Sequence, residues 1–123
     1  MHEPIVAVVD DDASVRRALT RLLQSAEFLV ITYASAAEFL EEGVSRGPAC
    51  VILDIHLGGM SGLELLSRLR ESGHGLPVVL ITAHDDAQTR EAAAQAGCTA
   101  YFRKPLDAKA LLEEVVTATK SAA

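Results

Sequence analysis

The apolar residues of this chain follow two alternating patterns. Short runs rich in valine and isoleucine predict strands, and longer stretches with apolar residues at helical spacing lie between them. Several of the short runs are apolar throughout, which is typical of strands covered on both faces. Strands separated by helices pair in parallel through right-handed crossovers, so the pattern predicts a three-layer α/β sandwich. The predicted strands lie near 5–9, 28–33, 49–54, 77–82 and 99–103.

Start and stop signals support the helices between these strands. Ser35 and Ser61 each precede a Glu at the spacing of a capping box, and Gly97 is placed to end a helix. Asp12 and Asp107 are expected as further N-caps. Helices are therefore predicted over 13–26, from Ser35 to about Ser45, from Ser61 to near Gly73, over 86–96 and from Asp107 onward.

Length and composition fit one globular domain, residues 1–123. The chain has 123 residues, of which 50% are hydrophobic, and no linker, repeat or low-complexity segment divides it. The net charge is −6, and the aromatic residues are three Phe and two Tyr, with no Trp. Nonspecific binding of nucleic acid needs cations for the phosphates and aromatic platforms for the bases, so this composition disfavours it.

The two cysteines, Cys50 and Cys98, stand in no metal-binding or redox motif. We expect two free thiols in a reducing compartment rather than a disulfide. The chain begins with no segment of the signal-peptide type, and no apolar run is long enough to span a bilayer. A soluble, cytoplasmic protein with no membrane partner is the expectation.

Polar residues follow the predicted strands where those strands end. Asp10, Asp11 and Asp12 come directly after the first strand, Asp54 ends the third, Thr82 ends the fourth, and Lys104 follows the fifth. Ligands of open parallel sheets bind at the carboxyl edge of the strands. Carboxylates gathered there repel one another unless a cation neutralises them, and their hard oxygen atoms suit Mg²⁺.

The residue types at this edge fit phosphoryl transfer. A carboxylate can attack phosphorus, which makes Asp54 the candidate nucleophile. Lys104 could pair with one phosphoryl oxygen, and Thr82 could donate a hydrogen bond to another. Each of these residues alone would be ordinary, because acidic residues at strand ends often cap helices, as we expect of Asp12.

The combination resembles the receiver domain of response regulators in two-component signalling. The resemblance is carried by Asp10-Asp11, Asp54, Thr82 and Lys104-Pro105, each after its predicted strand, and it covers essentially the whole chain. The sequence around these residues is most similar to that of FixJ-type transcriptional regulators. Further matching segments are Ser14-Val15-Arg16-Arg17, Met60-Ser61-Gly62-Leu63-Glu64 and Ala96-Gly97.

This resemblance implies a flavodoxin-like (βα)5 fold with strand order 2-1-3-4-5. It implies that Asp54 accepts a phosphoryl group from a sensor histidine kinase. Mg²⁺, or Mn²⁺ in its place, would be held by Asp11, Asp54 and the backbone carbonyl of His56, with Asp10 acting largely through water. Lys104 would contact the phosphoryl group, and the Lys104-Pro105 bond is expected to be cis.

The resemblance also implies a switch built from Thr82 and Tyr101. Phosphorylation would draw the Thr82 hydroxyl inward, Tyr101 would turn, and the surface of the fourth helix, fifth strand and fifth helix would change. That surface would contact an output domain or protein, and a phosphorylation-dependent homodimer is left open. Such a chain catalyses its own phosphorylation and dephosphorylation and is otherwise not an enzyme.

Some residues depart from the family pattern or have more than one interpretation. Gly58 stands where proline is usual, which predicts a more mobile loop after Asp54. His56 and His84 either tune the lifetime of the phosphoryl group or are solvent-facing loop residues. The basic pair Arg16-Arg17 either helps to bind the kinase or is ordinary surface charge.

Two other classes of protein remain as alternatives. A small phosphatase of the haloacid-dehalogenase type would use Asp10 as nucleophile, but it would leave Asp54 without a role. A flavin-binding module of the same fold would need an uncharged phosphate loop, and the loop after the first strand is triply acidic.

Overall fold

The computed structural model describes residues 3–121 and contains one five-stranded sheet. All strand pairs are parallel, and their order is β2-β1-β3-β4-β5. The predicted strand order is therefore confirmed, and each predicted strand is found with its ends shifted by no more than a residue. The strands are β1 (Ile5–Val9), β2 (Leu29–Tyr33), β3 (Cys50–Asp54), β4 (Val78–Thr82) and β5 (Ala100–Arg103).

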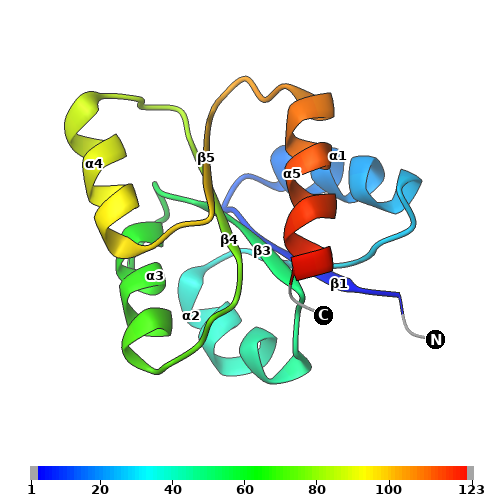
Figure 1. The fold of residues 1–123 in the computed structure, drawn as a ribbon, viewed down its shortest axis with the longest axis horizontal. Helices are drawn as coiled ribbons and strands as arrows, with labels where there is room; N and C mark the ends of the chain where they lie inside the picture. Colours follow the sequence, from blue (N-terminus) through cyan, green and yellow to red (C-terminus); the bar gives the residue numbers. More distant parts are fainter. Residues whose placement is uncertain (1–2, 122–123) are drawn as a thin grey trace.

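Helices cover both faces of this sheet (Figure 1). The helices α1 and α5 pack on one face, and α2, α3 and α4 lie on the other, which gives the predicted three layers. The helical elements are α1 (Ala13–Ser25), α2 (Ala36–Glu38) with the turns η1 (Phe39–Gly43) and η2 (Val44–Arg46), α3 (Gly62–Glu71), α4 (Ala87–Ala96) and α5 (Ala108–Ser121).

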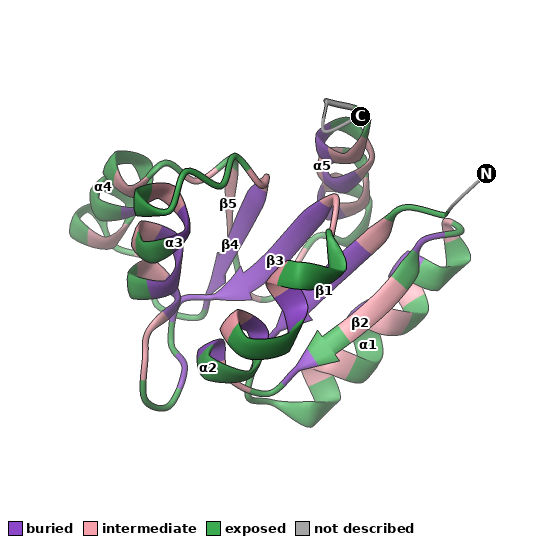
Figure 2. Ribbon diagram, turned by 90° about the horizontal axis from the view of Figure 1, so that it is seen from below, coloured by how far each residue is buried: buried purple, intermediate pink, exposed green. Residues whose placement is uncertain are grey.

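The core is divided by the pleat of the sheet. Successive side chains of β1, β3 and β4 point to opposite faces, so each strand supplies residues to both halves of the core. The central strands β3 and β4 are buried along their whole length, whereas β2 at the edge is not (Figure 2). The half under α1 and α5 contains Val6, Val8, Cys50, Ile52, Val79 and Ile81, and the other half contains Ala7, Val9, Val51, Leu53, Val78 and Leu80.

The helix predicted to run from Ser35 to about Ser45 is less regular than expected. Its N-cap is Ser35, whose hydroxyl accepts a hydrogen bond from the Glu38 N–H as predicted. The α-helix then gives way to a π-helical turn at Phe39–Gly43 and a 3₁₀ turn at Val44–Arg46. Crowding accounts for the choice of residue here, because a Cβ at Gly43 would lie 2.3 Å from Cδ1 of Phe39. The Phe39 ring packs edge-to-face on Tyr33 with ring centroids 5.4 Å apart.

Several local predictions are confirmed. Asp12 caps α1 by accepting from the Ser14 N–H, and Asp107 caps α5 by accepting from the Ala110 N–H. The Lys104-Pro105 bond is cis. Both cysteines are free, and burial raises the pKa of the Cys50 thiol to about 12.

Candidate functional site

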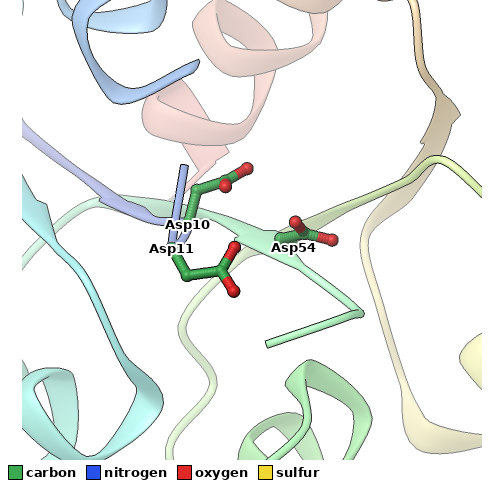
Figure 3. A group of neighbouring side chains, drawn as sticks. All are labelled: Asp10, Asp11 and Asp54. Carbon is green, nitrogen blue, oxygen red and sulfur yellow. The ribbon is translucent and has the colours of Figure 1, made fainter. Parts of the chain in front are cut away.

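The acidic site lies where two neighbouring strands of the sheet end. Because β1 and β3 are adjacent in parallel, Asp10 just after β1 and Asp54 at the end of β3 emerge side by side. Each of Asp10, Asp11 and Asp54 offers a carboxylate oxygen, and these oxygens lie within 4.8 Å of one another. Figure 3 shows the three side chains around a common space at this edge. Asp10 and Asp54 are buried, and Asp11 is exposed.

Asp10 is fully buried and tightly held. One of its carboxylate oxygens accepts from the Asp12 N–H at 2.9 Å, and the other accepts from Lys104 Nζ at 3.1 Å. Burial raises the pKa of Asp10, and the charge of Asp54 adds to that rise. The Asp12 N–H and Lys104 act in the opposite direction, but the net shift is upward. Ionisation of Asp10 is therefore less favourable in this site than in free solution.

Asp54 has hydrogen bonds to both carboxylate oxygens. The His56 N–H donates to one at 3.0 Å, and Lys104 Nζ donates to the other at 3.1 Å. Each carboxylate oxygen has two lone pairs, so both retain capacity to bind a further group. The Asp54 side chain is only 7% exposed, whereas Asp11 and His56 beside it are exposed.

Lys104 bridges the two buried carboxylates from the end of β5. Its ammonium lies 3.1 Å from an oxygen of Asp10 and 3.1 Å from an oxygen of Asp54. Burial alone would lower the pKa of Lys104, but the hydrogen bonds and charges of Asp10 and Asp54 outweigh it and raise the pKa. The lysine is therefore a positive charge held between the carboxylates of Asp10 and Asp54.

Thr82 ends β4, the neighbour of β3, and is fully buried. Its hydroxyl donates to the His84 carbonyl at 3.2 Å and accepts from the His84 N–H at 3.0 Å. No hydrogen bond joins Thr82 to the acidic group among residues 3–121. In this state the threonine is thus bonded to the β4–α4 loop.

Tyr101 in β5 is half-buried and has partners that the sequence did not reveal. Its hydroxyl donates to Asp85 at 3.2 Å, and the Arg90 guanidinium lies 5.7 Å from the centre of its ring. Arg90 also forms an ion pair with Asp85, whose side chain is 11% exposed. Burial raises the pKa of the Tyr101 hydroxyl, and the carboxylate of Asp85 adds to the rise. Asp85 thereby links the loop after β4, the first turn of α4 and the ring of Tyr101.

Two other contacts were missed by the sequence analysis. His56 and His84 are both exposed, and their rings meet edge-to-face with centroids 4.9 Å apart. Arg16 and Arg17 are not equivalent, because Arg16 is half-buried and donates to the backbone carbonyl of Asp10, whereas Arg17 is exposed. Neither contact has a signal in the sequence beyond the nearness of each residue to a site residue along the chain.

The donor set at this edge fits a hard divalent cation. Three carboxylates supply only oxygen ligands, and Mg²⁺ binds through a few carboxylates while it keeps several waters. Mn²⁺ accepts the same ligands. No sulfur or imidazole atom belongs to the cluster among the described residues, which disfavours a zinc or copper site.

Comparison with known proteins identifies the family. The model of the response regulator receiver domain matches residues 6–116, and the chain belongs to this family. Receiver domains are the signalling modules of two-component response regulators and bind Mg²⁺ through acidic residues. This finding confirms the resemblance and the class of function, and it does not favour the phosphatase alternative.

The similar proteins include transcriptional regulators. The chain is 41% identical over 110 residues to the transcriptional regulatory protein TdiR of Thauera aromatica, which covers 89% of this chain and 48% of TdiR. It is 37% identical over 110 residues to the transcriptional regulatory protein FixJ of Azorhizobium caulinodans, which covers 89% of this chain and 52% of FixJ. The chain thus spans about half the length of these two relatives.

Solved structures agree with the assignment of the fold. The crystal structure of FixJ-N superposes with a TM-score of 0.86 at 30% identity, and the match covers 98% of this chain and 96% of FixJ-N.

Within residues 3–121, none of the helices has the length and apolar character needed to cross a membrane.

Proposed function

We propose that residues 1–123 act as one receiver domain in which Asp54 accepts a phosphoryl group from a sensor histidine kinase. The observation that carries this proposal is the pair of hydrogen bonds from Lys104 to Asp54 and Asp10, with Asp11 beside them. A carboxylate held next to a fixed cation and two further carboxylates is equipped both to attack phosphorus and to bind a metal ion.

In the proposed reaction, an oxygen of Asp54 attacks the phosphorus of a phosphohistidine. A P–O bond forms, the P–N bond breaks, and its electron pair passes to the imidazole. Asp10, Asp11, Asp54 and the backbone carbonyl of His56 are the proposed ligands of Mg²⁺ or Mn²⁺. When bound, this ion would offset the charge of the carboxylates and of the arriving phosphoryl group. Lys104 would exchange a carboxylate partner for a phosphoryl oxygen.

Thr82 and Tyr101 are proposed as the switch. Phosphorylation would offer the Thr82 hydroxyl an anionic acceptor in place of the His84 carbonyl, which is a neutral one. Movement of the His84 segment would then disturb Asp85, to which Tyr101 is bonded. Through these contacts, a charge added at Asp54 would change the surface of α4, β5 and α5.

The partners follow from the same proposal. The kinase would supply the phosphoryl group, and an output domain or protein would bind the surface of α4, β5 and α5. Relatives named as transcriptional regulators support transcription as the regulated process. A phosphorylation-dependent homodimer through the same surface is a further state to test. The cytoplasm is the proposed location, and neither nucleic acid nor membrane is a proposed partner of this chain. Apart from its own phosphorylation and dephosphorylation, no catalysis is proposed.

A titration with beryllofluoride, which imitates the phosphoryl group, tests the proposal. In the presence of Mg²⁺, the wild-type chain is expected to bind it saturably, and Asp54→Ala is expected not to bind. Glu71→Gln is the matched control, because it removes a single charge from the exposed end of α3. Equal binding by wild type and Asp54→Ala would refute the proposal.

The phosphatase alternative makes a different prediction for the same chain. Reaction with acetyl phosphate, followed by mass spectrometry of the peptides, would label Asp10 in such an enzyme and Asp54 in a receiver domain. The Asp10 carboxylate is fully buried and already bonded to the Asp12 N–H and Lys104, which favours Asp54 as the acceptor.

A further inference from the structure

A hydrogen bond from α1 holds the backbone between two of the site aspartates. Nη1 of Arg16 donates to the backbone carbonyl of Asp10 at 2.7 Å. This carbonyl belongs to the planar peptide unit that joins Asp10 to Asp11. Arg16 therefore restrains the orientation of the peptide group from which the Asp11 side chain departs.

The two aspartates depend on this restraint to different degrees. The Asp10 carboxylate has its own hydrogen bonds, to the Asp12 N–H and to Lys104. Asp11 is exposed, and within the described part of the chain no hydrogen bond or ion pair holds its side chain. The direction of the Asp11 carboxylate is therefore determined mainly by its backbone.

Arg16 is itself firmly placed. Its N–H donates to the Asp12 carbonyl at 3.1 Å, and its own carbonyl accepts from the Thr20 hydroxyl at 2.7 Å. Asp12 in turn caps the helix through the Ser14 N–H. The guanidinium thus projects from a capped first turn back to the end of β1. Arg17 carries the same charge on the next residue but is exposed and has no hydrogen bond to this loop.

We propose that Arg16 is a positioning residue of the metal site, which keeps the Asp11 carboxylate directed at the space that it shares with Asp10 and Asp54. The inference rests on the proposed function, because it concerns the same metal ion. Arg16 acts through its hydrogen bond rather than through its charge. The charged side chains with the largest effects on the pKa of Asp10 are Asp54 and Lys104, and Arg16 is not among them.

Binding of Mg²⁺ alone, followed by NMR or calorimetry, tests the inference without a kinase. Partners that orient metal ligands typically contribute about 10–100-fold to metal affinity, so we expect Arg16→Met to weaken Mg²⁺ binding about tenfold. Methionine has nearly the helix propensity of arginine, so α1 should persist. Arg17→Met is the matched control and should bind Mg²⁺ within about twofold of wild type, since exposed charges contribute little. Wild-type affinity in Arg16→Met, or equal losses in both variants, would overturn the inference.

A second measurement needs no variant. In the metal-free wild-type chain, NMR of the arginine side chains should show hindered rotation of the Arg16 guanidinium and free rotation of that of Arg17. Addition of Mg²⁺ should shift the Arg16 resonances only. An Arg16 guanidinium that rotates freely and does not respond to Mg²⁺ would contradict the inference. Absence of Mg²⁺ binding by the wild-type chain would contradict the proposed function itself. Mg²⁺ binding that does not depend on Arg16 would contradict only the inference about Arg16.

Discussion

Leu53 and Asp54 are consecutive residues of β3, yet they lie in opposite environments. Leu53 is completely buried among apolar side chains, whereas Asp54 is 5% exposed and faces two other carboxylates and an ammonium group. The apolar strands β1 and β4 likewise lead to a polar residue, since Asp10 follows β1 and Thr82 ends β4. The apolar parts of the strands therefore stabilise the fold. Their carboxyl ends bring together three carboxylates, of which Lys104 neutralises only part of the charge.

Substitutions of Leu53 and of Asp54 test how much each residue contributes to stability. Leu53→Ala should lower the free energy of unfolding by about 2–5 kcal/mol, because it leaves a cavity in a close-packed core. Asp54→Asn should change the free energy of unfolding by no more than about 1 kcal/mol, because the lost pairing with Lys104 is offset by reduced repulsion from Asp10. Urea denaturation measures both values.

Beryllofluoride binding should be impaired more by Asp54→Asn than by Leu53→Ala, the reverse of their effects on stability. Leu53→Ala should still bind beryllofluoride under conditions in which it is folded, and Asp54→Asn should not. An Asp54→Asn variant as unstable as Leu53→Ala would show that the carboxyl edge contributes to stability after all.

A substitution at Asp10 tests whether the carboxyl edge is under electrostatic strain. Asp10→Asn removes a buried charge next to Asp54, so it should raise the free energy of unfolding of the metal-free chain by about 1 kcal/mol. The same variant should bind Mg²⁺ more weakly than wild type, because it loses a carboxylate of the cluster.

The gain from Asp10→Asn should depend on pH in a defined direction. The pKa of Asp10 is raised above 3.8 in the folded chain, so the folded state binds its proton more tightly than the unfolded state. The penalty is absent at pH values well below 3.8, grows as the pH rises from there through the folded pKa, and is complete above it. Urea denaturation of wild type and variant across this range is the measurement. A stability difference that does not depend on pH would exclude ionisation of Asp10 as its cause.

The sequence predicted which polar residues gather at the carboxyl edge because a rule of chain geometry brings them together. Parallel strands end at one edge, so Asp10, Asp54, Thr82 and Lys104 had to meet there once the strands were recognised. The strand order itself came from the family resemblance, not from the apolar pattern. The predictions for metal ligands and switch residues concern bound or phosphorylated states and stay predictions.

The features that the sequence did not reveal depend on side-chain packing between loops. In the π-helical turn after α2, the Phe39 ring lies so close to Gly43 that a Cβ there would clash, and no helix pattern encodes this contact. The contact between His56 and His84 and the bond from Tyr101 to Asp85 join different loops, and their geometry depends on rotamers. The mobility predicted for the loop at Gly58 is a matter for NMR relaxation, and it stays a prediction.

Tyr101→Phe tests whether a change at Asp54 reaches the surface of α4, β5 and α5. The substitution removes one hydrogen bond, from the ring hydroxyl to Asp85, and leaves the ring and its contact with Arg90 in place. If this bond exists only in the resting packing, its loss makes the switch easier by about 0.5–1.5 kcal/mol. The affinity for beryllofluoride should therefore rise by about twofold to thirteenfold, even though the variant lacks a stabilising contact.

Tyr33→Phe is the matched control for Tyr101→Phe. It removes a hydroxyl at the end of β2, which is the edge strand opposite β5. It should leave the affinity for beryllofluoride unchanged. A Tyr101→Phe variant with lower stability and wild-type affinity would mean that the bond to Asp85 persists in both packings. In that case the link from Asp54 to the surface of α4, β5 and α5 would have to pass through Thr82 and His84 alone, because Asp85 would no longer distinguish the two states.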